Sequence, residues 1–209
     1  MQDLLKKRWY SFCGIQGCSP QSTESIYGAI VDSYSQYFRQ YHQLGHLAGC
    51  FIQLDGIRPA LNDPEVVEYA LWFHDIVCVP RASSNEMLSA AAAGYAANRL
   101  GLSDRFGARA AELILLTNHK ATASDNDGAY FTDIDLTIFG QSWQGFMDYE
   151  RQIRAEYSSL SEKAYRQGRI QVVRFFLDKK TIYQTQYFRE KFEENARQNL
   201  LKLLKFLES

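Results

Sequence analysis

The sequence predicts an all-α fold, a helical bundle in a single domain, and three observations lead to this class. Apolar residues recur at intervals of three and four through most of the chain, which is the period of amphipathic helices. Clusters of turn-forming residues, such as CGIQGCSP and ASDNDG, are few. The 209 residues are 46% apolar, which is enough to bury one substantial core.

Capping residues and turn segments divide the chain into the expected helices. Pro64, whose fixed φ suits the first turn of a helix, begins the third of them, and Ser103 is a candidate N-cap. The helices are expected, in order, from 22 or 23 to about 41, from about 46 to 55, from 64 to about 78, from 84 or 85 through an alanine-rich stretch, from 103 to 119, and over about 133–139, 142–157, 161–180 and 187–207. The polar segment 120–130 is the best candidate for a mobile loop.

The charge distribution argues against a general nucleic-acid or membrane-surface binder. The chain carries 23 basic and 24 acidic side chains, a formal net charge of −1. Residues 1–150 carry 10 basic and 17 acidic side chains, whereas residues 151–209 carry 13 and 7. This division predicts an acidic, metal-holding part over about 22–140. The basic, helical C-terminal extension over about 141–209 either attracts anions or presents a solvated helix face.

Cysteine spacing and hydropathy predict a cytoplasmic protein without a membrane partner. The four cysteines, Cys13, Cys18, Cys50 and Cys78, form no CxxC pair, and the amino terminus lacks the apolar stretch of a signal peptide. No run approaches the roughly 18 apolar residues of a membrane-spanning helix. The oligomeric state does not follow from these features.

An ionisable pair is embedded in the third expected helix. His74 continues the stripe of Val67, Ala70 and Leu71 and should face inward. Asp75 follows about 100° round the helix, still among apolar residues. Burying an uncompensated carboxylate costs more than the marginal stability of a domain tolerates, so a positive group is expected to meet it. The alternative is a hydrogen-bonded core histidine beside a capping aspartate.

Carboxylates also interrupt the apolar run 131–139. Asp133 and Asp135 would diverge by about 200° on a helix, so only one is expected to reach a shared site while the other caps a helix or faces solvent. His46 opens a short apolar helix, where its imidazole lies at the rim of the stripe, and His119 ends another. Polar groups from several helices could therefore converge.

Two imidazoles and two carboxylates would form a mixed nitrogen and oxygen ligand set. Such a set predicts one divalent ion, with Mn²⁺, Fe²⁺, Co²⁺, Ni²⁺, Zn²⁺ and Mg²⁺ as the candidates. The ion would supply the missing positive charge, lower the pKa of a bound water and polarise a phosphoryl oxygen. Hydrolysis is therefore the expected chemistry.

Three sequence blocks carry these residues, namely YHQLGHL over Tyr41–Leu47, ALWFHD over Ala70–Asp75 and TDIDL over Thr132–Leu136. Their order of His, His-Asp and Asp resembles the H…HD…D signature of the HD superfamily of metal-dependent phosphohydrolases, which is carried on a helical bundle. The blocks are similar to the Y-H-x-L-x-H, A-L-W-F-H-D and D-x-D-L motifs of a bacterial group of predicted HD hydrolases. The resemblance extends over roughly residues 35–200.

The resemblance implies a metal site formed by His46, His74, Asp75 and Asp133. His46 is preferred to His42 because a short apolar helix follows it, as it follows the first histidine of the family. Asp133 is preferred to Asp135 because the family uses the first carboxylate of its D-x-D. Where the family group often has two adjacent histidines, this chain has Asn118-His119-Lys120, which puts a second metal and the family's substrate contact there in doubt.

Five further residues are candidates for the chemistry around the metal. Glu86 could act as a general base that orients the attacking water, and His119 could protonate the leaving oxygen or bind phosphate. The alternatives are a helix-capping role for Glu86 and a carbonyl-bonded imidazole for His119. His42, Arg154 and Arg169 are candidates for substrate binding, the arginines because their forked donors match a phosphate. Surface ion pairs are the alternative for the arginines.

The sequence thus predicts a metal-dependent phosphohydrolase that acts on a small phosphorylated compound, with nucleotides among the candidates. A different class of function is a non-catalytic, metal-containing nucleotide-binding or regulatory module. A third is an interaction scaffold in which the metal is purely structural.

Overall fold

A computed structural model describes residues 1–209 and contains helices but no strand, which confirms the predicted all-α class. The α-helices are α1 (Gln2–Ile15), α2 (Pro20–Tyr34), α3 (Leu44–Ile57), α4 (Pro64–Phe73), α5 (Asn85–Arg99), α6 (Asp104–Leu115), α7 (Asn126–Asp135), α8 (Trp143–Glu156), α9 (Glu162–Leu177), α10 (Gln186–Phe188) and α11 (Glu194–Glu208). The 3-10 segments η2 (Leu116–Asn118) and η3 (Leu136–Gly140) extend α6 and α7, and a π-helical segment, η4 (Arg189–Glu193), joins α10 to α11.

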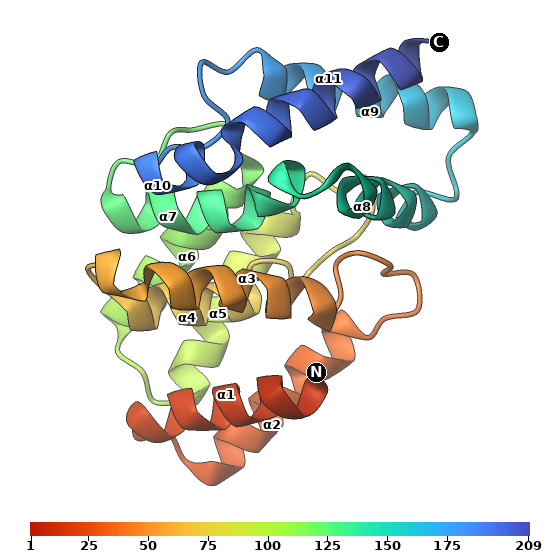
Figure 1. The fold of residues 1–209 in the computed structure, drawn as a ribbon. Coiled ribbons are helices and arrows are strands. Elements are labelled where there is room, and N and C mark those ends of the chain that lie inside the picture. Colours follow the sequence, from red (N-terminus) through yellow and green to blue (C-terminus); the bar gives the residue numbers. More distant parts are fainter.

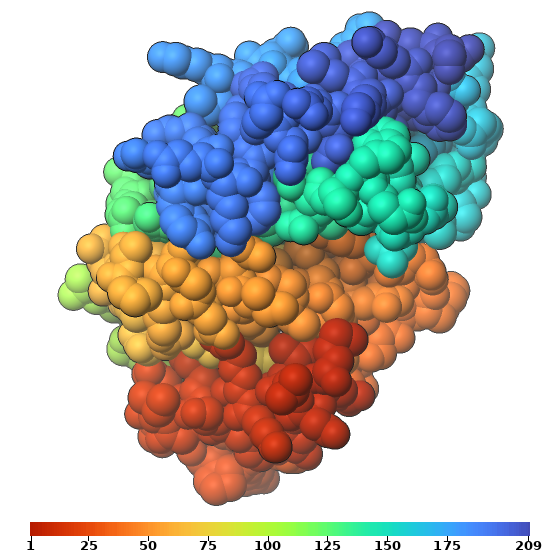
Figure 2. Space-filling view, in the orientation of Figure 1, coloured from red at the N-terminus to blue at the C-terminus, as the bar shows by residue number.

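The helices are stacked approximately in chain order. Helices α1 and α2 lie at one end, α9 and α11 lie at the other, and α3 to α7 lie between them (Figure 1). The surface shows the same order as successive bands of colour (Figure 2). One cluster of buried apolar residues extends from Leu5 in α1 to Leu207 in α11, so the chain forms a single domain around one core. None of the helices is both long enough and apolar enough to cross a membrane.

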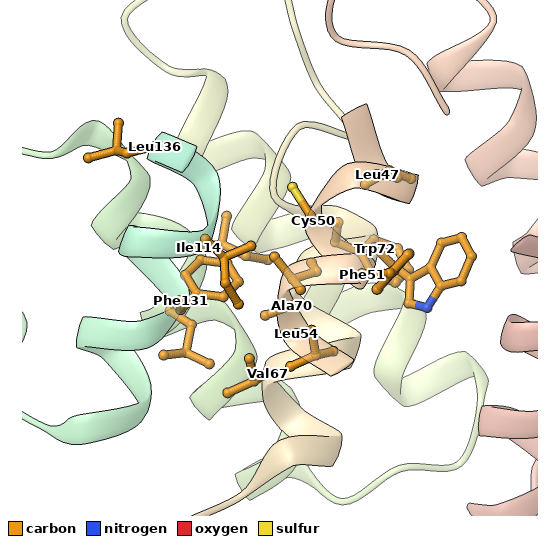
Figure 3. Packing of buried hydrophobic residues seen from close by; sticks show 14 of the residues in the cluster. Leu47, Cys50, Phe51, Leu54, Val67, Ala70, Trp72, Ile114, Phe131 and Leu136 are labelled. Atoms are coloured by element: carbon orange, nitrogen blue, oxygen red, sulfur yellow. The ribbon is translucent and has the colours of Figure 1, made fainter. Parts of the chain in front are cut away.

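The centre of this core is the packing of α3 against α4. Figure 3 shows it for Leu47, Cys50, Phe51 and Leu54 of α3, for Val67, Ala70 and Trp72 of α4, and for Ile114, Phe131 and Leu136 of the neighbouring segments. Burying a large apolar side chain stabilises the fold by about 1.5–3 kcal/mol. The buried residues of α3 and α4 extend to the start of α3 and to the end of α4. Their packing therefore fixes the positions of His46 and His74.

The first helix was not predicted from the sequence. Helix α1 buries Leu5, Trp9 and Phe12, whose spacing of four and three is a helical stripe. The Trp9 indole donates a hydrogen bond to the carbonyl of Thr23 over 3.0 Å, which ties α1 to α2. The turn-rich segment that follows α1 obscured this short stripe.

Helix α2 is displaced from its predicted span of 22 or 23 to about 41. It begins at Pro20, because the Ser19 hydroxyl caps it by accepting from the backbone N–H of Ser22. It ends at Tyr34, and the segment 35–43 that follows is not helical. That segment supplies contacts to the site described below.

Helix α4 ends at Phe73, before the predicted boundary near Cys78. The turn that follows is held by a buried cation, Arg39, which donates to the carbonyl of Asp75 over 2.6 Å and to that of Ile76 over 2.9 Å. A side chain from outside the helix thus fixes the path of the chain after α4. His74 and Asp75 therefore lie just beyond the last turn of α4.

The segment 120–130, expected to be a mobile loop, contains the first turn of α7. The Asp125 carboxylate caps α7 by accepting from Gly128 N over 2.8 Å. The Asp127 carboxylate accepts from the backbone N–H groups of Asn62 and Asp63, each over 2.8 Å. Asp125 and Asp127 of this segment therefore cap and anchor α7, whereas residues 120–125 precede the helix as a loop.

Candidate metal centre and the adjoining cavity

Two helix ends and one helix start bring the candidate ligands together. His46 lies in the first turn of α3, His74 and Asp75 directly follow α4, and Asp135 is the last residue of α7. The carboxyl ends of α4 and α7 carry partial negative charge from their helix dipoles, which favours a cation at this point.

The four side chains form one group in which the ligand atoms all lie within 4.8 Å of one another. The Nε2 atoms of His46 and His74 are 2.9 Å apart. Asp75 Oδ2 lies 3.1 Å from His74 Nε2 and 3.5 Å from His46 Nε2. Asp135 Oδ1 lies 3.3 Å from His46 Nε2 and 3.6 Å from His74 Nε2.

These separations fit the edges of a metal coordination polyhedron. Bonds of about 2.1 Å to nitrogen and oxygen place neighbouring ligand atoms about 3.0 Å apart in an octahedron and about 3.4 Å apart in a tetrahedron. The distance between the two imidazole nitrogens and the four distances from these nitrogens to the carboxylate oxygens lie between 2.9 and 3.6 Å. This range includes both expected separations. The donor set of two nitrogens and two oxygens suits divalent ions of the first transition series. The group could therefore hold such an ion.

The tautomer of His74 also suits a ligand. Its Nδ1–H donates to the carbonyl of Leu71 over 2.8 Å, which leaves the lone pair of Nε2 directed at the centre of the group. His74 is fully buried, whereas the side chains of Asp75 and Asp135 are 24% and 18% exposed. The carboxylates therefore connect the buried imidazoles to a space that solutes can reach.

The charges of the group are strongly coupled. Burial by itself lowers the pKa of His74, but the facing Asp75 and Asp135 carboxylates outweigh it and raise that pKa well above its usual range. Burial favours the neutral form of both acids, yet the histidines hold the pKa of Asp75 and that of Asp135 well below their usual range. Without a cation the imidazoles would retain protons, and a divalent ion would displace them.

The predicted ligand Asp133 is not in this group, and the choice between the two aspartates is corrected to Asp135. The two carboxylates leave α7 in different directions. Asp133 Oδ1 accepts from Gln184 N, and its Oδ2 accepts from the N–H and the hydroxyl of Thr185, each over 2.7 Å. Burial raises the pKa of Asp133 to about 6 in spite of these bonds. Asp133 therefore anchors the segment before α10 to α7.

Some residues around the group were not predicted. Arg39 is 1% exposed and joins the His42 carbonyl to the turn after α4. The Tyr34 hydroxyl accepts from Asp75 N over 3.3 Å. Cys50 Sγ lies 3.7 Å from His46 Nε2. Of these residues, only Cys50 could have been placed near the group from the sequence, because it lies one helical turn beyond His46.

A cavity of about 330 Å³ opens beside Asp75 and Asp135. Four of the predicted site residues line it as well, namely His42, Glu86, His119 and Arg169. They come from the segment before α3, from α5, from the end of η2 and from α9. The structure thus collects most of the predicted residues around one space, although they are far apart in the sequence.

His119 is held against the metal group by an unusual backbone conformation. Its φ is 55°, in the left-handed region that few residues other than glycine adopt. Its Nε2 is 3.0 Å from Asp135 Oδ2, and its carbonyl accepts from Lys179 Nζ over 2.8 Å. His119 also borders a second cavity, of about 350 Å³, which Lys179, Lys180 and Arg189 line as well. Basic residues of the C-terminal part therefore do reach the neighbourhood of the site.

His42 belongs to a second polar group with Glu156 and Cys78. Glu156 Oε1 accepts from three successive backbone N–H groups, those of residues 40–42, over 2.8 to 3.0 Å. Glu156 Oε2 is 2.7 Å from His42 Nδ1. Burial opposes the charge of Glu156, but these bonds lower its pKa to about 2. The pKa of His42 is raised to about 10, because Asp75, Cys78 and Glu156 outweigh the effect of burial.

The two predicted substrate-binding arginines differ. Arg169 is buried in the cavity wall, where it pairs with the Glu150 carboxylate and donates to the Tyr149 hydroxyl over 3.1 Å. Arg154, in contrast, does not line the cavity. Its guanidinium bonds Glu162 and the carbonyls of Tyr157 and Leu160, so it closes the carboxyl end of α8.

Comparison of the chain with protein-family models, curated proteins and solved structures finds no match.

Proposed function

We propose that the chain is a metal-dependent phosphohydrolase of the HD type that acts on a small phosphorylated compound. The observation that carries the proposal is the group of His46, His74, Asp75 and Asp135, whose mutual distances suit one divalent ion. The two carboxylates of this group border a cavity whose walls carry acid, base and cation side chains. A purely structural metal would be enclosed by its ligands, whereas this group opens onto a space.

When bound, a divalent ion supplies a Lewis acid that stabilises charge on a phosphoryl oxygen and makes water more acidic near neutral pH. Side chains of the protein would then carry out the proton transfers. Asp135 orients the His119 imidazole through their 3.0 Å contact, which suits His119 to protonate a leaving oxygen. The half-buried Glu86 carboxylate lines the same cavity and is suited to accept a proton from the attacking water.

The positive side chains of the cavity suit an anionic substrate. Arg169 and His42 line the space that Asp75 and Asp135 border. Because Glu150 and Glu156 hold these two cations in place, they lose little conformational entropy when a phosphate arrives.

The test is metal content and turnover measured on the same protein. Purified protein is incubated with Mn²⁺, Co²⁺ or Ni²⁺, dialysed, analysed for bound metal and assayed on a panel of phosphoesters and nucleotides. We expect about one ion per chain and hydrolysis of at least one substrate. Asp75→Asn should lose both, whereas Asp32→Asn, a matched change at an exposed position of α2, should lose neither.

Two results would contradict the proposal. A protein that retains no metal and hydrolyses nothing on the panel would exclude the phosphohydrolase. Tight nucleotide binding with bound metal but without turnover would instead support a non-catalytic nucleotide-binding module.

A further inference from the structure

The second cavity beside His119, of about 350 Å³, is separate from the cavity that the metal group borders. Its walls come from the loop before α7, from the turn after α9 and from the segment that includes the start of η4. The two cavities share only His119 and Leu136, and neither Asp75 nor Asp135 lines the second one. We call this space the basic cavity.

Positive side chains line the basic cavity, and acidic ones do not. The cations are Lys179, Lys180 and Arg189. Elsewhere in the C-terminal part Arg169, Arg174 and Arg197 pair with glutamates, whereas the cations of the basic cavity pair with none. Residues 151–209 carry 13 basic and 7 acidic side chains, so part of this excess is gathered in one enclosed place rather than spread over a solvated helix face.

Neighbouring carboxylates are already bonded to other donors. Asp133 accepts from the backbone N–H groups of Gln184 and Thr185 and from the Thr185 hydroxyl. Glu193 accepts from Ile182 N over 3.0 Å and from the Arg197 guanidinium over 2.8 Å. The cations of the basic cavity therefore keep N–H donors for which the fold provides no carboxylate.

Lys179 is the cation that the fold holds most firmly. It is half-buried, and its Nζ donates to the carbonyl of His119 over 2.8 Å, which leaves two of its three N–H donors unused. Burial lowers the pKa of Lys179, and no acid counteracts this effect. An anion in the cavity would stabilise the charged form of Lys179, which burial disfavours.

The remaining polar groups of the wall are also donors. Arg189 uses one N–H on the carbonyl of Gln184 over 2.9 Å, so the rest of its guanidinium is available. The hydroxyls of Thr122 and Thr181 line the cavity as well. A ligand here therefore meets several donors and few free acceptors.

We infer that the basic cavity binds a phosphate-type oxyanion at a site distinct from the metal centre. A phosphate carries up to two negative charges and has several acceptor oxygens, which suits a forked guanidinium beside two ammonium groups. A carboxylate has a single charge and two oxygens, so it would leave more of these donors unused. A nucleic-acid backbone would need a wider basic surface than the chain, with its net charge of −1, provides.

The first experiment uses the metal-free protein, because a bound ion would itself attract phosphate. Inorganic phosphate is titrated by calorimetry in the presence of a chelator at constant ionic strength, and one phosphate binds per chain. Lys180→Gln lowers the affinity about tenfold, because it removes one charge-assisted contact. Its Tm is unchanged, since the Lys180 ammonium makes no bond within the fold. Lys163→Gln, the same change at an exposed position of α9, leaves the affinity unchanged.

The second experiment locates the bound anion. Backbone amide NMR signals of Lys180, Thr181 and Gln184 shift on addition of phosphate, whereas those of His42 and Arg169, which line the other cavity, do not. Glycerol phosphate is titrated in parallel, and both ligands lose affinity in Lys180→Gln. Tighter binding of glycerol phosphate identifies an organic phosphate as the ligand, whereas equal or weaker binding identifies the free anion.

The inference is independent of the proposed function, and the outcomes keep the two apart. Phosphate binding that does not saturate, an equal loss of affinity in Lys180→Gln and Lys163→Gln, or shifts confined to His42 and Arg169 would each exclude the anion site. None of these results bears on hydrolysis at the metal centre. A protein that binds phosphate in the basic cavity but retains no metal and hydrolyses no phosphoester would keep the anion site and exclude the phosphohydrolase.

Discussion

Two groups of histidine and carboxylate side chains border the same cavity, and they differ in how their atoms are already used. In the group of His46, His74, Asp75 and Asp135, both Nε2 atoms and one oxygen of each acid face a common centre. In the second group, both oxygens of Glu156 are bonded, one to three backbone N–H groups and the other to His42.

The difference teaches that residue types alone do not define a metal site. Backbone N–H groups compete with a cation for carboxylate lone pairs, and in the second group they hold one oxygen of Glu156. We therefore propose that the first group binds the ion, whereas the second group anchors the segment 35–43. The same contrast separates Asp135 from Asp133, which lie only two residues apart.

The largest expected effect comes from Asp135→Asn. It removes a charged ligand and the contact that orients His119, so metal affinity and kcat/KM should fall on the order of 10³-fold. The Tm of the metal-free protein should fall as well, because the facing histidines hold the pKa of Asp135 well below its usual range and its charge therefore stabilises the fold near neutral pH. Metal analysis with steady-state kinetics measures the first effect, and thermal unfolding in a chelator measures the second. If this variant retained its metal, the ion would have to be bound by other residues.

Metal affinity should rise steeply with pH. Burial lowers the pKa of both imidazoles, but Cys50 and Tyr41 together with the two carboxylates outweigh it at His46, and Asp75 and Asp135 outweigh it at His74, so that both pKa values lie well above the usual value. A raised folded pKa gives stability that is present below the unfolded value near 6.5 and is lost as pH rises through the folded pKa. An ion must displace these protons, so each proton released changes affinity about tenfold per pH unit. Competitive titration between pH 6 and 9 tests this, and an affinity independent of pH would contradict the assignment.

Asp133→Asn should lose stability but keep its metal, unlike Asp135→Asn. An amide can accept at only one of the two oxygen positions, and its NH₂ would face the donors of Gln184 or Thr185. We expect the free energy of unfolding to fall by about 2–3 kcal/mol with metal content unchanged. Chemical denaturation and metal analysis of the two variants together decide between the aspartates. Metal loss from Asp133→Asn at a temperature where it remains folded would reverse our assignment.

The sequence predicted the helical class and the convergence of His46, His74 and Asp75, because both depend on local patterns. The stripe that places His74 inward and the pairing of His74 with Asp75 are visible within one helix. The choice between Asp133 and Asp135 depended on the segment 181–185, whose N–H groups approach from a distant part of the chain. A local sequence pattern does not indicate a hydrogen-bond partner from a distant segment.

The same reason explains why the role of Arg39 was not predicted and why Arg154 was considered for substrate binding. Arg39 fixes the turn after α4 from a position outside that helix, and its role is visible only once the segment 35–43 is placed. Arg154 was predicted to bind substrate on the strength of its chemistry, but the carbonyls of its own chain occupy its donors. Long side chains reach several partners, and tertiary structure selects among them.

The smallest expected effect belongs to the second group. Glu156→Gln keeps an acceptor for the N–H groups of residues 40–42 but loses the charge that faces His42. The folded pKa of Glu156 is about 2, below its usual value near 4.5, so its charge stabilises the fold above pH 4.5 and this contribution is lost as pH falls towards 2. The shift corresponds to at most about 3 kcal/mol for removing the charge, and the retained acceptor should reduce the loss to about 1–2 kcal/mol. Unfolding curves from pH 3 to 7 should therefore be flatter for the variant, with metal content preserved. If metal is lost while the fold is intact, Glu156 acts on the ion, and the two groups are not distinct.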